Sequence, residues 1–123
     1  MSNSSTSPRL DVVIRNAINS GTIPGPRYLA NSQEIATLGR LGDTSPPHIE
    51  IPEMSFGAVV SGAEEMRRTV RQFVKYGVDL LKLNLSGEEI AGVGAEETPM
   101  TDEECATAVD EAKRRGSRVC AHA

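Results

Sequence analysis

The residue whose chemistry stands out is Lys82, a single lysine inside an apolar run at positions 78–85 that reads as a strand. A second strand-like run at 117–123 carries His122. Lysine is rarely buried unless it is paired, coordinated or otherwise employed. A lysine that must face a core therefore needs a partner, and the histidine one strand later predicts a shared site.

Alternation along the first run decides which side chains share a face with Lys82. Alternate residues of a strand point the same way, so Leu80, Lys82 and Asn84 form one row, opposite Leu81 and Leu83. An inward lysine and asparagine are unusual in a purely structural core. They are normal in a closed (β/α) barrel, where residues near the carboxyl ends of the strands line the active site. His122 is also near the carboxyl end of its strand.

Two kinds of chemistry suit a lysine in this position. Burial favours the uncharged amine, which can act as a nucleophile or add carbon dioxide to become a carbamate. A carbamate has two oxygens that can bridge two divalent cations, and histidine is the usual companion ligand. The alternative is that Lys82 extends to solvent and that His122 is only a polar strand end. Residue patterns alone favour this alternative, because single-residue signals are weak.

Three helices and three strands are predicted to position these residues. The helices, each with one apolar face at a period of 3.6, are expected at 10–20, 62–76 and 102–115. The strands are short apolar runs, expected at 27–30, 78–85 and 118–123. The segment 31–57 is rich in Gly, Pro, Ser and Asp and is expected to be a long irregular loop, in which His48 is solvated.

The helix starts carry recognisable signals. Capping boxes are expected at Ser61–Glu64 and at Thr101–Glu104, one before each of the two later helices. The buried face of the last helix is expected to consist of Cys105, Ala108, Val109 and Ala112.

Helices and strands alternate with short links, which predicts parallel strands joined by right-handed crossovers. The fold class is therefore α/β, and the pattern fits either a small doubly wound sheet or a piece of a (β/α) barrel. Residues 1–9 are expected to be a disordered tail, and residues 10–123 a single domain.

The composition excludes several classes of function. The net charge is −4, from 13 Lys and Arg against 17 Asp and Glu that are interspersed, so no basic stripe indicates nucleic-acid binding. No apolar run approaches the roughly 18 residues of a membrane helix, and the polar N-terminus is not a signal peptide. Cys105 and Cys120 are expected to be buried free thiols, as in a cytoplasmic protein.

Three motifs in order carry a family resemblance. They are DVVIRNAINSGTIPGPRYL at 11–29, the helix at 64–71 followed by GVDLLK at 77–82, and TDEE at 101–104 followed by AKRRGSRVCAHA at 112–123. Together they resemble the metal-dependent amidohydrolases, in the branch of imidazolonepropionase-like and Xaa-Pro dipeptidase-like enzymes. The match covers nearly the whole chain after the first nine residues.

The resemblance implies a (β/α)8 barrel with one or two divalent metal ions, often zinc, of which this chain forms about three βα units. In that family the lysine matching Lys82 is carboxylated and bridges the metals, and the histidine matching His122 is a metal ligand. A metal-activated hydroxide attacks an amide or related carbon–nitrogen bond of a small-molecule substrate. The resemblance assigns no further catalytic residue to this chain.

The sequence also departs from the family. The first barrel strand of the family carries a His-x-His pair, which this chain lacks, and Leu41 stands where many relatives have a histidine between glycines. A full barrel needs roughly 250 residues, so this chain covers under half of one. The isolated chain is expected to be inactive and to associate through open strand edges. The alternative function is that of a non-catalytic, truncated α/β binding module.

Overall fold

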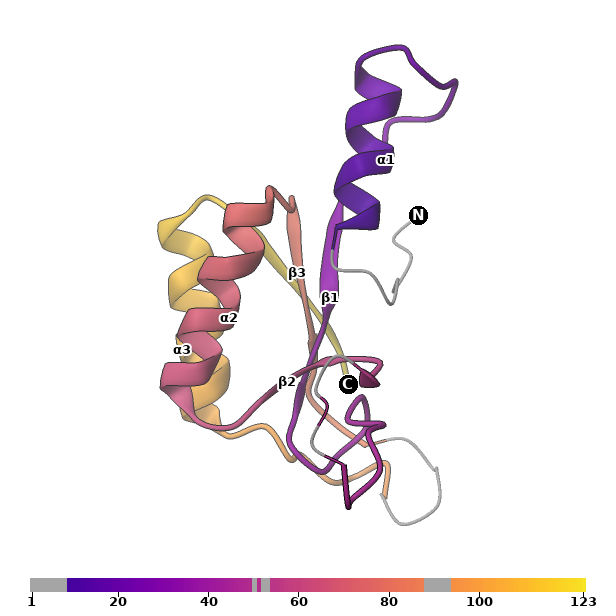
Figure 1. Cartoon of the computed structure of the whole chain (residues 1–123). Coiled ribbons are helices and arrows are strands. Elements are labelled where there is room, and N and C mark those ends of the chain that lie inside the picture. The colour runs from indigo at the N-terminus through magenta and orange to yellow at the C-terminus, as the bar shows by residue number, and fades with distance from the viewer. Residues whose placement is uncertain (1–8, 50, 52–53, 88–93) are drawn as a thin grey trace.

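The computed structural model describes residues 9–49, 51, 54–87 and 94–123, so the expected tail at 1–9 lies almost wholly outside the described residues. In chain order the described elements are α1 (Leu10–Asn19), β1 (Asn31–Thr37), β2 (Ala58–Val60), α2 (Ala63–Tyr76), β3 (Leu80–Asn84), α3 (Asp102–Arg114) and β4 (Arg118–His122). The strands form one parallel sheet in the order β2-β1-β3-β4. Helices α2 and α3 lie side by side against one face of it, and α1 lies at the amino end of β1 (Figure 1).

The hydrophobic core lies between the sheet and the pair of helices. Met66, Val70 and Phe73 recur on one side of α2 at a helical period, and all three are buried. They belong to the same buried cluster as Leu81 and Leu83 of β3. Because side chains alternate along a strand, the intervening residues of β3 point to the opposite face of the sheet.

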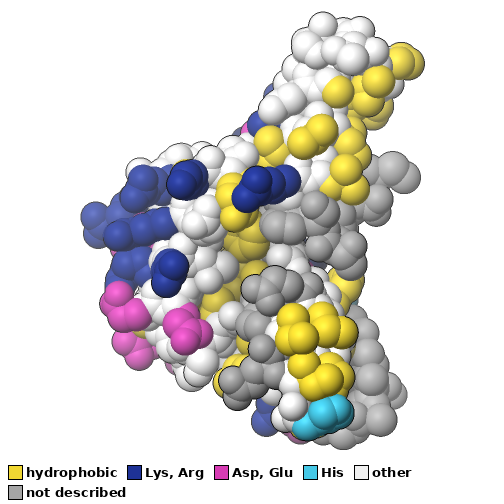
Figure 2. All heavy atoms as spheres, viewed as in Figure 1, with side chains coloured by type: hydrophobic (Ala, Val, Ile, Leu, Met, Phe, Trp, Pro, Cys, Tyr) yellow, Lys and Arg dark blue, Asp and Glu magenta, His cyan; other side chains and the backbone are white. Residues whose placement is uncertain are grey.

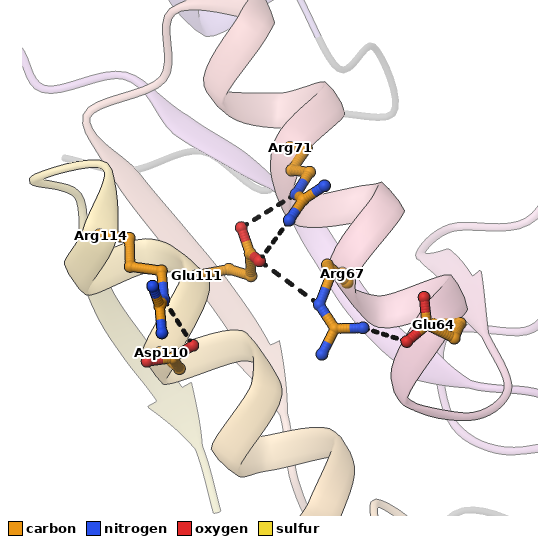
Figure 3. A network of polar contacts seen from close by, with 6 residues as sticks. All are labelled: Glu64, Arg67, Arg71, Asp110, Glu111 and Arg114. Carbon is orange, nitrogen blue, oxygen red and sulfur yellow. Dashed lines mark hydrogen bonds and ion pairs between the residues drawn. The ribbon is translucent and has the colours of Figure 1, made fainter.

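An ion-pair network joins the two helices on their outer side (Figure 3). Glu111 of α3 accepts hydrogen bonds from Arg71 Nη2 at 2.8 Å and Arg71 Nε at 3.1 Å. Arg67 Nε lies 3.4 Å from the same carboxylate, and Arg67 also pairs with Glu64. The hydrogen bonds from Arg71 lower the pKa of Glu111. A carboxylate on α3 is thus held by two guanidinium groups of α2.

The charges of the helix layer are separated along its length. Acidic residues occupy the first turns of α2 and α3, and basic residues occupy their last turns. Figure 2 shows the same separation, with Lys and Arg gathered at the upper part of the helix layer and Asp and Glu below them. This arrangement complements the helix dipoles.

The first strand is displaced from its predicted position. The strand expected at 27–30 is wrong, because β1 spans Asn31–Thr37, inside the segment expected to be a loop. Pro24 and Pro26 keep the preceding segment extended, and the first backbone bonds to the β3 segment are those that the Ala30 carbonyl accepts from the N–H groups of Asp79 at 2.8 Å and Leu80 at 3.2 Å, at the very end of the expected range. Strand β1 was not predicted because its buried residues include Asn31, Ser32 and Glu34, which give it the composition of a loop. The short strand β2 was not predicted either.

The helix starts confirm one expectation and correct another. At α3 the Thr101 hydroxyl accepts from the Glu104 N–H, and the Glu104 carboxylate accepts from the Thr101 N–H, which is the predicted capping box. The capping box expected at Ser61–Glu64 is wrong, because Gly62 is the N-cap of α2 and makes no side-chain cap. Instead Glu104 reaches across and accepts the Gly62 N–H at 2.8 Å.

Helix α3 also differs from expectation in its buried face. Ala108 and Ala112 are buried as predicted, whereas Val109 is 48% exposed and Cys105 is partly buried. Glu104, Thr107 and Glu111 take the remaining buried positions. The two glutamates are tolerated there because their carboxylates have partners on α2 or at its start. Cys105 and Cys120 are free thiols as expected, but each is only partly buried, and desolvation raises the pKa of Cys105.

Helix α1 is tied to the sheet by polar contacts. Arg15 Nη1 donates to Asp79 Oδ2 and to the Gly77 carbonyl, each at 2.7 Å. The same Asp79 oxygen accepts the Ala30 N–H at 2.8 Å, just before β1 begins. These bonds connect α1 to the amino ends of β1 and β3. No helix among the described residues is long and apolar enough to cross a membrane.

Candidate functional site

The face of the sheet opposite α2 and α3 carries the candidate site. Lys82 on β3 is paired in register with Glu34 on β1 and with Cys120 on β4. Residues paired in register point to the same face, so these three side chains form a row across the sheet. Glu34 is 9% exposed, while Lys82 and Cys120 are partly buried. We call this side of the sheet the inner face.

A second row lies one step nearer the carboxyl ends of the strands. Asn84 of β3 is paired with His122 of β4, and both share the inner face with Lys82. Lys82 and His122 are therefore diagonal neighbours on adjacent strands, with α-carbons roughly 8 Å apart by ideal sheet spacings. Both side chains are long enough to meet at a common point from that separation. Their role as metal ligands stays a prediction.

The backbone under Lys82 is held by a residue that the sequence did not reveal. The pairing of β1 with β3 is irregular between Asn31 and Glu34. At this irregularity the Ser32 hydroxyl accepts the Lys82 N–H at 2.9 Å and donates to the Gln33 carbonyl at 2.8 Å. The hydroxyl thus takes the place of a backbone carbonyl of β1 as the acceptor for the Lys82 N–H. Irregularities of this kind in a sheet often redirect side chains near active sites.

The remaining members of the rows have different surroundings. The Cys120 thiol donates a hydrogen bond to the Leu81 carbonyl at 3.4 Å, so its hydrogen is already bonded within the sheet. His122 is exposed on β4, the last strand of the sheet. Asn84 is 3% exposed, and its Oδ1 has no hydrogen-bond partner among the described residues. Within those residues no group of three or more His, Cys, Asp or Glu side chains could hold a metal ion.

The loop after β1 packs closely against the carboxyl end of that strand. Gly57 donates its N–H to the Gly42 carbonyl at 2.7 Å. A Cβ at Gly42 would lie 2.7 Å from the Ala36 Cβ, and a Cβ at Gly57 would lie 2.9 Å from the Glu34 carbonyl oxygen. Glycine is required at both positions because the loop touches the strand there.

Asp43 organises the same loop. Its carboxylate accepts the Gly39 N–H at 2.8 Å and hydroxyl hydrogen bonds from Ser45 at 2.8 Å and Ser55 at 3.0 Å. These bonds, chiefly the one from Gly39, lower the pKa of Asp43. The predicted loop region is therefore folded after β1 ends, and His48 within it is exposed as expected.

A further contact joins the loop that follows β1 to the segment that follows β3, at the carboxyl end of the sheet. Arg40 pairs with Glu97 at 2.8 Å, and Glu97 also accepts the Gly87 N–H through its carbonyl at 3.0 Å. Arg40 follows β1 and Gly87 follows β3, so the contact crosses between neighbouring strands. Loops in this position frame the active site in (β/α) barrels.

Solved structures of known proteins share the fold of this chain. No family model matches the chain, and no curated protein matches it. Among solved structures it is similar to a Xaa-Pro dipeptidase with methionine bound in its active site, at 33% identity and a TM-score of 0.80 over 95% of this chain. It is similar to a prolidase in complex with N-methylphosphonate-L-proline at 25% identity and a TM-score of 0.81, over 99% of this chain. The ochratoxinase of A. niger shares the fold at 23% identity and a TM-score of 0.76, over 91% of this chain.

This chain has the fold of an amidohydrolase segment. It spans about 30% of the length of the dipeptidase and about 31% of the prolidase. The predicted fold class is confirmed: the four parallel strands and the helices on their outer side form part of a (β/α) barrel. The family resemblance seen in the sequence is confirmed with it. In such a barrel the inner face, with Lys82 and His122, faces the barrel axis.

Proposed function

We propose that these residues form a segment of a metal-dependent amidohydrolase that cleaves amide or other carbon–nitrogen bonds of small molecules. The observation that carries the proposal is the placement of Lys82 and His122 on one face, on adjacent strands and near their carboxyl ends. The similarity to a Xaa-Pro dipeptidase and a prolidase supports it.

The residues present fit a divalent metal such as zinc, one or two ions of it, as part of a ligand set. His122 offers an imidazole nitrogen, and Lys82 offers an amine that can add carbon dioxide and present carbamate oxygens. The orphaned Asn84 Oδ1 beside them indicates that this part of the inner face is built to meet a polar group. Two ligands are fewer than the three or four of a stable zinc site, so the other ligands must come from elsewhere in the barrel.

The metal, when bound, supplies water activation and polarisation of the substrate carbonyl.

The residues of this chain hold the strand that carries the predicted metal ligand Lys82. Ser32 holds the backbone of Lys82 through the bond at 2.9 Å, so the lysine leaves the strand in one direction. Leu81 and Leu83, buried on the other face, hold β3 against the helices. With the backbone held in this way, only the Lys82 side chain itself has to become ordered when it binds a ligand.

The decisive experiment replaces the lysine in the complete enzyme that contains this segment. Lys82→Ala is expected to abolish amide hydrolysis and to lower the metal content measured by elemental analysis, because a metal ligand would be lost. Bicarbonate with a short carboxylic acid should restore part of the activity by supplying a carboxylate in the vacated space. Lys75→Ala, on the exposed outer side of α2, is the matched control and should change neither quantity. Full metal content and activity in the Lys82 variant would overturn the proposal.

The alternative function is that of a non-catalytic binding module, which an incomplete ligand set on this segment fits as well as it fits the enzyme. The described residues contain no group of three or more His, Cys, Asp or Glu side chains that could hold a metal. The enzyme proposal expects weak zinc binding by the isolated 123-residue chain and tight binding by the complete protein, whereas the binding module expects weak binding by both. Dialysis followed by elemental analysis of each separates the two. Stoichiometric zinc on the dialysed isolated chain would contradict the proposal that further ligands are needed.

A further inference from the structure

Asn84 is the residue of the inner face whose chemistry the proposed function leaves unexplained. It is the last residue of β3, two positions beyond Lys82 and directly opposite His122. Its side chain is buried, with 3% of the residue exposed. Its Oδ1 meets no hydrogen-bond donor among the described residues.

A buried acceptor without a donor is costly. Buried polar atoms in folded proteins are nearly always paired, so each exception needs a structural or functional reason. Asn84 neighbours both predicted metal ligands, two positions after Lys82 and paired with His122, at the end of the sheet where ligands bind in (β/α) barrels. A ligand donor entering from the barrel axis would satisfy it.

We infer that Asn84 is a substrate-contacting residue whose Oδ1 accepts a hydrogen bond from an N–H group of the substrate. This inference rests on the proposed function and deepens it, because it assigns the site a preference for ligands that carry an amine or amide N–H. A carbonyl oxygen is a poor ligand for zinc beside nitrogen and carbamate donors, whereas it is an ordinary acceptor for N–H. A role of Asn84 as a metal ligand is therefore the competing outcome of the test.

The test measures binding of two probes to the complete, metal-loaded protein by calorimetry. The first probe is L-methionine, and the second is 4-(methylsulfanyl)butanoate, which has the same carbon chain and carboxylate without the amine. The unmodified protein is expected to prefer methionine. Asn84→Leu, which is similar in volume but cannot accept a hydrogen bond, should reduce that preference about tenfold, as expected for one charge-assisted hydrogen bond. Binding of the amine-free probe should not change.

Asn31 provides the matched control. It is also a buried asparagine, 4% exposed, with an unpartnered Oδ1, and it is paired in register with Leu80. It lies at the amino end of β1, away from the ends where Asn84 and His122 lie. Asn31→Leu should keep the full preference for methionine. If both asparagine variants lose it equally, the loss is structural and the inference is wrong.

Two further measurements keep the outcomes apart. Asn84→Asp keeps an acceptor oxygen and should keep the preference for methionine, so its loss in a folded Asp variant would overturn the inference. Metal content should be unchanged in Asn84→Leu, and loss of metal there would show that Asn84 acts at the metal instead. If the unmodified protein binds no metal and neither probe, the proposed function itself fails. If it binds both while Asn84→Leu keeps the preference, only the role of Asn84 fails.

Discussion

The two faces of the sheet use the same strands for different purposes. On the face covered by α2 and α3, Ile35, Leu81 and Leu83 are between 0% and 2% exposed and belong to one apolar cluster. On the inner face, at positions of the same strands that alternate with these, Glu34, Lys82 and Asn84 are polar, and their side chains make no hydrogen bond or ion pair within the described residues. The apolar face therefore supplies the stability of the sheet, and the inner face can carry polar groups that are costly to bury.

The two ends of the sheet differ in what lies beside their buried acceptors. At the amino end, Asp79 satisfies Arg15 and the Ala30 N–H, while the Oδ1 atoms of Asp11 and Asn31 have no partner among the described residues. At the carboxyl end, the unpartnered Asn84 Oδ1 belongs to a residue that neighbours Lys82 and His122 on the inner face. Unsatisfied acceptors therefore occur at both ends, and it is the position of Asn84 beside the two predicted metal ligands that makes it a candidate for contact with a ligand.

The largest expected effect on stability tests the contrast between the faces directly. Leu81→Ala should lower the free energy of unfolding by about 2–5 kcal/mol, because it leaves a cavity in the core between β3 and the helices. Leu80→Ala removes the same atoms from the inner face, where Leu80 is only partly buried, and should cost about 1 kcal/mol or less. Urea unfolding of both variants, followed by circular dichroism, measures the difference. Equal losses would mean that the inner face is packed as tightly as the core.

Much of this arrangement could be read from the sequence, and the reason is local. Helices α2 and α3 and strands β3 and β4 were predicted within one or two residues, because an apolar face at helical period and a glycine at the helix end are local signals. The orientation of Lys82 followed from simple alternation along a single strand. The parallel arrangement followed from short links between alternating elements.

The rest depended on contacts between distant segments. Ser32 lies 50 residues from Lys82, and its bond to the Lys82 N–H exists only because β1 and β3 pair irregularly. Register between parallel strands that are far apart in the chain is not encoded in either strand alone. Glu34 escaped notice for the same reason, since its run of polar neighbours has the composition of a loop.

The next effect concerns the two outer strands. Strands β2 and β4 end the sheet on either side, and in a barrel each would pair with a further strand. We predict that the isolated 123-residue chain associates or aggregates, because unpaired edge groups accept other chains. Gel filtration with light scattering measures this. A sharp monomer peak together with a cooperative thermal transition would show instead that the segment is stable on its own.

The smallest expected effect lies outside both faces, in the ion-pair network between α2 and α3. Hydrogen bonds from Arg71, and the positive charges around it, lower the pKa of Glu111 in the folded protein. A lowered folded-state pKa contributes stability that is present above the pKa of glutamate in the unfolded chain and is lost as pH falls through the folded value. The thermal midpoint should therefore decline on acidification, and Glu111→Gln should lower the midpoint at neutral pH and flatten that decline.

Asp110→Asn is the matched control, because Asp110 is the neighbouring carboxylate and pairs with Arg114 in an exposed contact four residues apart on the same helix. Pairs of that kind contribute little, so this variant should keep both the midpoint and its pH dependence close to those of the unmodified protein. Thermal unfolding from neutral to acidic pH, followed by circular dichroism, compares the three proteins. If Glu111→Gln and Asp110→Asn have the same thermal midpoint and the same pH dependence, the ion-pair network does not stabilise the packing of α2 against α3. The stability of the covered face would then come from its apolar contacts alone.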